Sequence, residues 1–489
     1  MLFNSHIFML LFLPLLLAGW YFLNWKKKFQ LAQGYLIGMS LWFYAYANLQ
    51  YLWLLLFSCL IGWLLSCLPE KIFSEKGKKV LTGVGCVFHL GLLGYFKYSN
   101  FFLENLNTVF HTDFPMLQIL LPVGISFYTF QQLAYLIDRC RGDAPRDSFF
   151  DYLTFMVYFP QLLQGPILLR SEFMGQLKEP ERRRFHAERF SEGIQFFVFG
   201  LAKKVLLADT LAKAVNYGYS NVSMLDSISA LLLAVGYLTE LYFDFSGYCD
   251  MAVGLGKMIG LEVAENFDAP FHSASVKEFW RRWHMTLGRF FTRYVYIPLG
   301  GNRRGKMRTL CNVMIVMLLS GLWHGAAWTF VLWGFLHGVG MIWDNLEHPH
   351  LPKKWMRQAA TFAYVCMTFV FFRAESIAQG FDVLKSIVSL KWNGFVFQMA
   401  SALDMTEFYM ITKALSMKLP GLLSWFWLGI FVVLIAICFR VLSGEKVSGA
   451  VALQRQKGYG RLYPVLLAVL FTWSMISMTG VSEYLYFSF

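Results

Sequence analysis

Long apolar runs separated by short polar segments make up most of this chain. A run of about 20 apolar residues is long enough to cross the hydrocarbon core of a bilayer as a helix. The pattern predicts spans near residues 7–23, 30–48, 51–68, 80–98, 115–136, 190–208, 228–243, 310–345 (one bent helix or two short ones), 357–373, 422–441 and 461–479. We therefore expect an all-α polytopic membrane protein with roughly 11 to 13 membrane helices.

The basic residues between these runs predict how the chain is oriented. Three lysines at 26–28 follow the first run and the loop 69–79 is again rich in lysine, whereas the loop 99–113 has no Lys or Arg. Cytoplasmic loops carry the excess of positive charge, so the N-terminus is expected outside. No basic residue precedes the first run and no small-residue cleavage site follows it, which favours a retained span over a signal peptide.

Two stretches do not fit ordinary spans. Residues 149–169 are apolar, yet Arg-rich segments flank them on both sides, and Pro160, Gly165 and Pro166 interrupt them. Irregular backbone at membrane depth needs protein or water around it, so we expect a re-entrant segment lining a cavity open to the cytoplasm. One kinked ordinary span is the alternative. Residues 268–308 are aromatic and basic, which suits interfacial or re-entrant helices.

Composition supports the membrane class and narrows the partners. The chain is 57% hydrophobic and only 15% charged, more apolar than a soluble domain needs. Its net charge of +13 comes from Lys and Arg between apolar runs, so we interpret it as membrane orientation and lipid contact and expect no nucleic acid. The eight Cys stand singly without CxxC spacing, which predicts neither a disulfide framework nor a zinc site.

Histidines within apolar sequence are the candidates for chemistry. His324 stands in "SGLWHGAAWTF", residues 320–330, and an ionisable group at membrane depth is a functional hypothesis. Gly321 and Gly325 leave space beside it, and a neutral imidazole can act as a general base on a hydroxyl. A packed imidazole bonded to a backbone carbonyl is the alternative. No metal is expected, because His337 is 13 residues further, about 20 Å along a continuous helix.

Several motifs resemble the membrane-bound O-acyltransferase (MBOAT) superfamily. They are "FPQLLQGPI", "YFDFSGYCDMAVGLGKMIG", "ENFDAPF", "EFWRRWHMTLGRF", "YVYIPLGGNRRG" and "GLWHGAAWTFVLWGFLHG". The best match is the bacterial branch that acetylates alginate and other exopolysaccharides. The resemblance implies a single membrane-embedded domain over residues 1–489, built around a central funnel or tunnel. Its parts would be N-terminal spans in 1–140, a catalytic core in 141–345, and C-terminal spans with an aromatic end in 346–489.

The resemblance also implies a reaction and its partners. An acetyl group would pass from a cytoplasmic thioester donor, acetyl-CoA or an acyl carrier protein, to an extracytoplasmic polysaccharide. Transfer would be direct or through a periplasmic or surface-anchored partner similar to SGNH hydrolases. No cofactor would be tightly bound, and the location would be the bacterial cytoplasmic membrane. D-alanyl transfer to teichoic acid is the alternative within the superfamily, and a transporter or flippase is the alternative outside it, weakened by the lack of visible repeats.

Candidate site residues follow from the motifs. The expected catalytic histidines are His324 and His284, and the expected substrate-binding residues are Trp323, Trp283, Gln161, Gln164, Arg281 and Arg282. The chain departs from the branch after "RWH": a usual Arg-Asp pair is replaced by Thr292 and Arg293, so no role of that Asp carries over. Asp244, in "YFDFSGYCD", is expected to pair with an arginine rather than to catalyse.

The last eight residues of the sequence, "SEYLYFSF", are unusually aromatic. They resemble the aromatic ending of small accessory peptides and of some enzymes of this superfamily, which implies that Tyr486 is a transient acyl carrier. A phenol with a pKa near 10 is not far above a thiol near 8.5, so an aryl ester keeps much of the transfer potential of a thioester. Anchoring at the membrane interface is the alternative.

Overall fold

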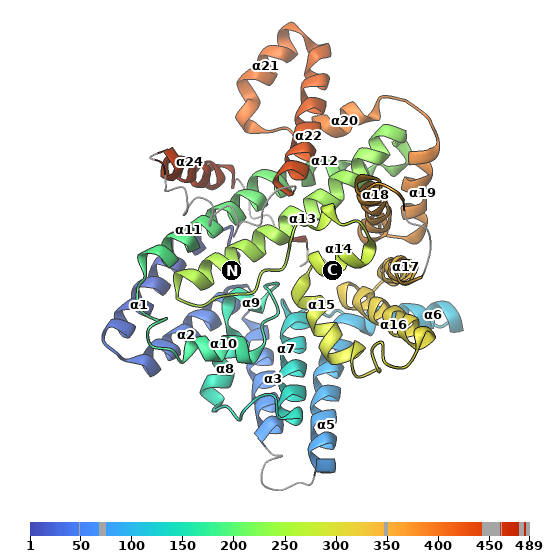
Figure 1. The fold of residues 1–489 in the computed structure, drawn as a ribbon. Helices are drawn as coiled ribbons and strands as arrows, with labels where there is room; N and C mark the ends of the chain where they lie inside the picture. The colour runs from blue at the N-terminus through green and yellow to red at the C-terminus, as the bar shows by residue number, and fades with distance from the viewer. Residues whose placement is uncertain are drawn as a thin grey trace. The chain divides into compact units, whose positions relative to one another are not determined.

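The computed structural model describes residues 1–47, 49–67, 75–346, 351–442, 460, 462–478 and 484–485, and the regular elements in these ranges are all helices (Figure 1). Six of them are long and apolar enough to cross a membrane: Phe8–Trp25, Gln50–Cys67, Lys76–Phe110, Ser227–Met258, Lys306–His324 and Pro420–Ile437. The all-α membrane class is thus confirmed. A total of 11 to 13 membrane helices around a tunnel stays a prediction.

Two compact units interleave along the chain. Unit 1 comprises Met1–Val198, Tyr248–Glu265 and Arg289–Val295, and unit 2 comprises Phe199–Gly247, Asn266–Gly288 and Tyr296–Phe489. Boundaries fall inside the helices α11 (Ala187–Ala202), α13 (Ser227–Met258), α15 (Met285–Phe291) and η6 (Thr292–Tyr296). The single domain over residues 1–489 stays a prediction.

Unit 1 contains the N-terminal helices. They are η1 (Phe8–Phe12), α1 (Leu13–Trp25), α2 (Phe29–Ala47), α3 (Gln50–Cys67), α5 (Glu75–Leu93), η2 (Gly94–Tyr98), α6 (Ser99–Phe110), α7 (Ile125–Arg141), α8 (Phe149–Val157), α9 (Phe159–Leu162), α10 (Arg170–Leu177) and most of α11 (Ala187–Ala202). Helices α1 to α3 lie close to the runs expected from the apolar pattern.

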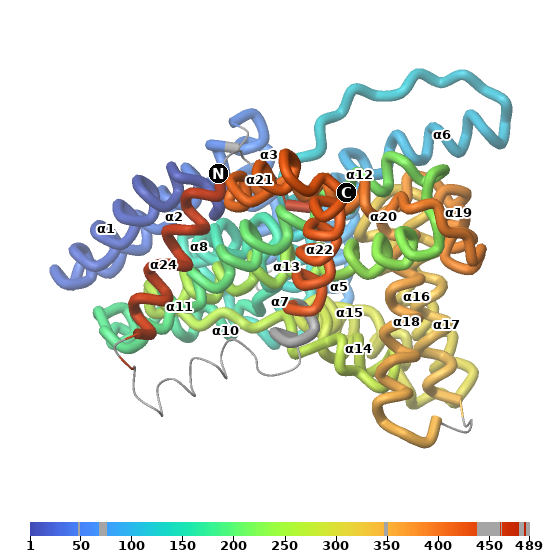
Figure 2. Tube along the Cα trace, turned by 90° about the horizontal axis from the view of Figure 1, so that it is seen from above, coloured from blue at the N-terminus to red at the C-terminus, as the bar shows by residue number. Residues whose placement is uncertain are grey.

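Around residue 110 the expected boundaries are wrong. The span predicted to end at residue 98 continues through η2 and α6 to Phe110, and the span predicted to begin at 115 starts only with α7 at Ile125. Pro115 and Pro122 disfavour helix at the residues before them, which explains the late start. The intervening chain doubles back along α6, where Asn100 and Asn107 hold it by side-chain hydrogen bonds (Figure 2).

The predicted re-entrant segment is broken into pieces too short to span. Helix α8 has nine residues and α9 four, with an extended kink at Tyr158 between them. Asp147 before α8 forms a bidentate ion pair with Arg170 at the start of α10. This ion pair joins the two ends of the segment. That the segment enters and leaves the membrane on one side stays a prediction.

Unit 2 contains the two histidine motifs and the C-terminal helices. Its elements are η3 (Lys203–Ala208), α12 (Asp209–Ser220), the first part of α13, α14 (Val276–Arg282), the start of α15, α16 (Lys306–His324), α17 (Trp328–Asn345), α18 (Lys354–Arg373), α19 (Ile377–Val388), α20 (Phe395–Ser401), α21 (Tyr409–Lys418), α22 (Pro420–Leu442) and α24 (Leu462–Ser477). Between residues 268 and 288 the helices are short, and an interfacial or re-entrant position for residues 268–308 stays a prediction.

The apolar run 310–345 forms two helices rather than one. Helix α16 ends at His324, and extended residues Gly325 and Ala327 turn the chain into α17. The two helices pack side by side (Figure 1), with Gly321 against Gly334. A Cβ on Gly321 would lie 2.3 Å from the Phe330 carbonyl oxygen, so only glycine permits this approach. The break places His324 at a helix end facing the start of α17.

Candidate active site

Two buried histidines lie together in unit 2. The ring centroids of His284 and His324 are 6.5 Å apart, although the residues are 40 positions apart in the sequence. His284 comes from the turn between α14 and α15 and is 0% exposed, and His324 ends α16 and is 3% exposed. The structure therefore brings the two histidines named from the sequence into one site.

His284 is held in a strained and specific geometry. Its φ of +46° lies in the left-handed region, which a non-glycine residue rarely adopts. Its Nδ1 lies 3.4 Å from Oδ1 of Asn266, which also accepts hydrogen bonds from the backbone N–H and the hydroxyl of Thr286. An amide oxygen can only accept, so Nδ1 carries the proton and Nε2 is the basic nitrogen.

Burial keeps His284 neutral. It lowers the pKa of His284 from 6.5 to about 3, so the ring is uncharged at any ordinary pH. Its Nε2 is buried and has no hydrogen-bond partner within the described part of the chain. A neutral imidazole with an available acceptor nitrogen can accept a proton or a hydrogen bond from a substrate.

His324 is enclosed by aromatic rings. The ring centroids of Trp323, Trp333 and Phe372 lie 4.9, 5.1 and 5.2 Å from that of His324. Trp323 also packs against His284, at 6.0 Å, so this tryptophan touches both histidines. These rings surround the imidazole of His324 with aromatic surface.

A third histidine, His337, has a structural role. Its Nδ1 accepts from Trp280 Nε1 at 3.2 Å and its Nε2 lies 2.9 Å from the hydroxyl of Thr368, so both nitrogens are occupied. Its ring centroid is 4.8 Å from that of Trp333. Neither of its two hydrogen-bond partners is His324. Among the described residues no group of three or more His, Cys, Asp or Glu could hold a metal ion.

Two cavities of unit 2 lie at opposite ends of the α17–α18 pair. The first, which we call the Lys354 cavity, has a volume of about 960 Å³. It is lined by Ala274, Ser275, Val276, Lys277, Glu278, Val339, Gly340, Trp343, Asp344, Leu351, Lys354, Arg357, Ala360, Thr361 and Tyr364. Lys277 is already bonded to Asn345, whereas Nε of Arg357 is buried without a partner in the described residues.

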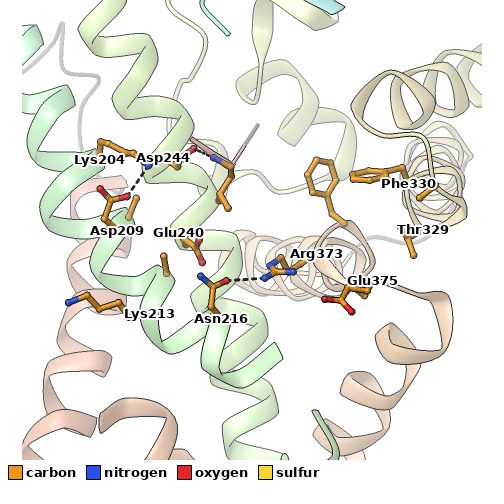
Figure 3. A pocket seen from close by; sticks show the side chains of 16 residues that line it. Lys204, Asp209, Lys213, Asn216, Glu240, Asp244, Thr329, Phe330, Arg373 and Glu375 are labelled. Carbon is orange, nitrogen blue, oxygen red and sulfur yellow. Dashed lines mark hydrogen bonds and ion pairs between the residues drawn. The ribbon is translucent and has the colours of Figure 1, made fainter. Parts of the chain in front are cut away.

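The second cavity, which we call the Leu485 cavity, has a volume of about 660 Å³ (Figure 3). It is lined by Lys204, Ala208, Asp209, Ala212, Lys213, Asn216, Glu240, Asp244, Ala327, Thr329, Phe330, Phe372, Arg373, Ala374, Glu375 and Leu485. The start of α17 and the end of α18 form part of its wall. The wall of the Lys354 cavity contains the end of α17 and the first half of α18 instead.

A column of aromatic rings joins the two cavities. It runs from Tyr364, in the wall of the Lys354 cavity, through His337, Trp333 and His324 to Phe372, in the wall of the Leu485 cavity. Neighbouring ring centroids along it are 4.8 to 6.4 Å apart. His324 therefore stands one ring away from the Leu485 cavity and on the line between the two.

The Leu485 cavity contains polar residues that sequence reasoning missed. Lys204 forms ion pairs with Asp244 and Asp209. Asp244 therefore pairs with a lysine and not with the arginine expected from the sequence. Glu240, one turn before Asp244, is 2% exposed, and its Oε2 has no hydrogen-bond partner in the described ranges. In the sequence, Lys204, Glu240 and Asp244 are visible as ionisable residues within apolar runs. Which of them pair with one another is decided only by folding.

The remaining predicted residues are dispersed. Trp283 stacks on Phe279, Arg282 pairs with Glu278, and Arg281 is exposed. Gln161 and Gln164 belong to unit 1, so their relation to the histidines stays a prediction. Both are buried, and neither amide atom of Gln164 has a hydrogen-bond partner among the described residues. Tyr486 lies outside the described residues.

The fold and site define a helical membrane protein with two buried histidines between a partly basic cavity and a mixed-charge one. Comparisons with known proteins agree. The model of the MBOAT, membrane-bound O-acyltransferase, family matches residues 141–380. The peptidoglycan O-acetyltransferase of Helicobacter pylori is 35% identical over 423 residues, covering 80% of this chain and 80% of that protein. The probable alginate O-acetylase AlgI of Azotobacter vinelandii is 39% identical over 389 residues, covering 77% and 76%.

The chain belongs to the membrane-bound O-acyltransferase family and is an O-acetyltransferase of its bacterial branch. The teichoic acid D-alanyltransferase of Bacillus subtilis is a more distant relative, 28% identical over 271 residues that cover 52% of this chain and 69% of that protein. Family membership decides for an enzyme over the transporter alternative.

Proposed function

We propose that this protein transfers an acetyl group across the cytoplasmic membrane. The donor is a thioester at the Lys354 cavity, and the receiving hydroxyl is at the Leu485 cavity. The observation that carries the proposal is the position of His324 on the ring column between two cavities at opposite ends of one helix pair. The final acceptor is a polysaccharide outside the cytoplasm, as the names of the relatives suggest.

The charges at the two ends support this direction. Helix α18 has 20 residues, which rise about 30 Å, close to the thickness of a bilayer core. Lys353, Lys354 and Arg357 gather at its first turn, and positive charge marks the cytoplasmic end of a span. The Lys354 cavity is therefore assigned to the cytoplasm and the Leu485 cavity to the outside.

The same end suits the phosphate of a thioester carrier. No side chain caps the start of helix α18, and the positive end of a helix dipole favours an anion. Lys354 and Arg357 add positive charge at that point. Both acetyl-CoA and the phosphopantetheine arm of an acyl carrier protein bring phosphate next to the thioester arm, so the proposal holds for either donor.

The chemistry needs one base and one carbonyl carbon. His324 accepts the proton of the attacking hydroxyl, whose oxygen forms a bond to the thioester carbonyl carbon. The carbon–sulfur bond then breaks, and the leaving thiolate takes the proton from His324. The second basic nitrogen of the site is Nε2 of His284, whose ring is neutral and lies beside that of His324. It orients the attacking hydroxyl or the imidazole of His324.

The hydroxyl that attacks first is proposed to be that of Tyr486. Residues 484–485 support this, because Leu485 lines the cavity one ring away from His324. Tyr486, once acetylated, would give its acetyl group to the serine of a partner similar to SGNH hydrolases, which would pass it to the polysaccharide. The Lys354 cavity makes D-alanyl transfer possible in the same geometry, but nothing in the structure favours it over acetyl transfer.

Two variants test the proposal in proteoliposomes supplied with an acetyl thioester and the acceptor. His324→Gln should lower transfer by about a hundredfold to ten-thousandfold, the usual effect of losing a general base. His186→Gln, which changes an exposed histidine, is the matched control. If His324→Gln keeps a third or more of the transfer, His324 is not the base.

Tyr486→Phe tests the carrier separately. It keeps the size and apolar character of the side chain and removes only the phenolic oxygen. Loss of transfer, together with an acetyl group on the C-terminal peptide of the wild-type protein by mass spectrometry, supports the carrier. Near-normal transfer would instead support the interface anchor.

A further inference from the structure

A buried charge cluster stands beside the Leu485 cavity. Nζ of Lys204 lies 2.6 Å from Asp244 Oδ1 and 2.8 Å from Asp209 Oδ1 (Figure 3). The side chains of Lys204 and Asp244 are 2% and 1% exposed. Buried charges are stable only when they are paired and hydrogen-bonded. The contact of Lys204 with Asp244 uses Oδ1, so Oδ2 of this buried carboxylate needs a further hydrogen-bond donor.

Residues 484 and 485 supply that donor. The backbone N–H of Leu485 donates to Oδ2 of Asp244 at 3.0 Å, the oxygen that Lys204 does not use. Nζ of Lys204 lies 4.6 Å from the ring centroid of Tyr484, a cation–π contact, and Tyr484 is 0% exposed. Both halves of the ion pair thus contact a segment that is 241 positions from Asp244 in the sequence.

We infer that Lys204 and Asp244 form a docking site for an aromatic peptide, the protein's own segment 484–485. Lys204 recognises the ring of Tyr484, and Asp244 recognises the N–H of Leu485. Because consecutive Cα atoms are only about 3.8 Å apart, holding Leu485 sets the point from which residue 486 continues. Lys204 and Asp244 are therefore positioning residues for the proposed carrier, and this role rests on the proposed function.

The cluster is built for a ligand rather than only for the core. Asp244 adds a charge whose outer oxygen has the Leu485 N–H as its partner. Glu240 presents another acceptor one turn earlier in the same cavity, with Oε2 unpaired among the described residues. The site accordingly suits a segment that brings N–H or O–H donors next to an aromatic ring.

The chain offers a matched pair of variants. Asp244→Leu removes a carboxylate that contacts both Lys204 and the segment, whereas Asp209→Leu removes one that contacts Lys204. Both leave Lys204 with one carboxylate. Hydrogen exchange of the C-terminal peptide, read by mass spectrometry on the full chain in detergent, measures the Leu485 N–H. The exchange rate should rise roughly tenfold or more in Asp244→Leu, the effect of losing a hydrogen bond to a charged group, and change little in Asp209→Leu.

Acetyl transfer should follow the exchange. Asp244→Leu should lower the amount of acetyl on Tyr486 and the rate of transfer, with the KM for the thioester donor unchanged, because the donor cavity is at the other end of α17 and α18. Equal exchange in the two variants would show a structural ion cluster and overturn the docking site. If Tyr486→Phe keeps full activity while the exchange contrast holds, the carrier proposal falls and the docking site stands.

A second measurement needs no variant in the core. The synthetic peptide SEYLYFSF, added in excess to the wild-type protein, should displace the segment and raise the exchange rate of its N–H. The same peptide with an N-methyl group on its leucine lacks the donor that Asp244 accepts and should not compete. Equal competition by both peptides, or by neither, would overturn the assignment of Asp244.

Discussion

At the scale of single residues, Arg293 stands where the resemblance to the family would place an aspartate, and it has a role in packing. Arg293 forms ion pairs with Asp138 and Asp143, and the hydroxyl of Tyr294 donates to the other oxygen of Asp138. These residues all belong to unit 1. Arg293 therefore ties the start of η6 (Thr292–Tyr296) to the end of α7, a role in packing that needs no aspartate at that position.

The buried and neutral state of His284 predicts a pH effect on stability. Its pKa is about 3 in the folded protein and 6.5 when unfolded, so between these values only the unfolded chain binds the proton. Folding free energy is then lost as pH falls below 6.5, by up to about 1.4 kcal/mol per pH unit. In His284→Asn, which tolerates the positive φ, unfolding should depend less on pH between 6.5 and 4.

Denaturant unfolding in detergent at pH 7, 6, 5 and 4 measures this slope. His186→Asn, which changes a histidine near the surface, should keep the slope of the wild-type protein. If His284→Asn also keeps it, His284 is not the residue that takes up the proton on unfolding.

At the scale of helices, the contact between α16 and α17 decides where His324 lies. A methyl group on Gly321 would overlap the Phe330 carbonyl oxygen, because both backbones are already in contact there. Gly321→Ala should destabilise the protein by about 1 to 3 kcal/mol, the usual effect of overpacking, and lower the transfer rate by displacing His324. Gly429→Ala on α22, where a Cβ meets open space, is the control.

Thermal unfolding and transfer rates of these two glycine variants can be compared directly. An equal melting temperature for Gly321→Ala and the wild-type protein would mean that the helices can separate without cost. The position of His324 would then depend on its surrounding rings and not on the helix contact.

The broken segment after Asp147 makes a prediction about membrane sidedness. Its two ends meet in the Asp147–Arg170 ion pair, so both should face the cytoplasm. Cysteines at Pro145 and Ser171, both exposed and outside the ion pair, should be labelled by a membrane-impermeant maleimide only in inverted vesicles. Labelling of either cysteine from the outer side would restore the kinked ordinary span.

At the scale of the whole molecule, the two cavities predict separate effects on donor and acceptor. Arg357→Gln in the Lys354 cavity removes a cation whose Nε has no partner among the described residues, and it should raise the KM for acetyl-CoA. Arg303→Gln changes an exposed arginine of the basic loop 302–308 and should leave that KM nearly unchanged. Steady-state kinetics at two salt concentrations measure both, since screening weakens a surface effect more than a buried one.

A larger effect of Arg303→Gln than of Arg357→Gln would move the donor site to that exposed loop. The proposed direction of transfer along α17 and α18 would then lose its support at the cytoplasmic end.

The sequence by itself determined the membrane class, most helix positions and the histidines of interest. These follow from local rules: apolar length predicts a span, Pro and Gly interrupt it, and an ionisable residue within it is costly and therefore informative. The local rules failed around residue 110. There the helix persisted through polar residues, because the side chains of Asn100 and Asn107 bind the returning chain.

Only the tertiary structure decided which residues act together. His284 and His324 are 40 positions apart, and Asp244 and Leu485 are 241 apart, so no spacing rule relates them. Their meeting depends on the break after His324, on the Gly321–Gly334 contact and on the pairing of Lys204 with two carboxylates. Side-chain pairing between distant segments is set by packing and by the need to satisfy buried charge, and neither can be read from a linear pattern.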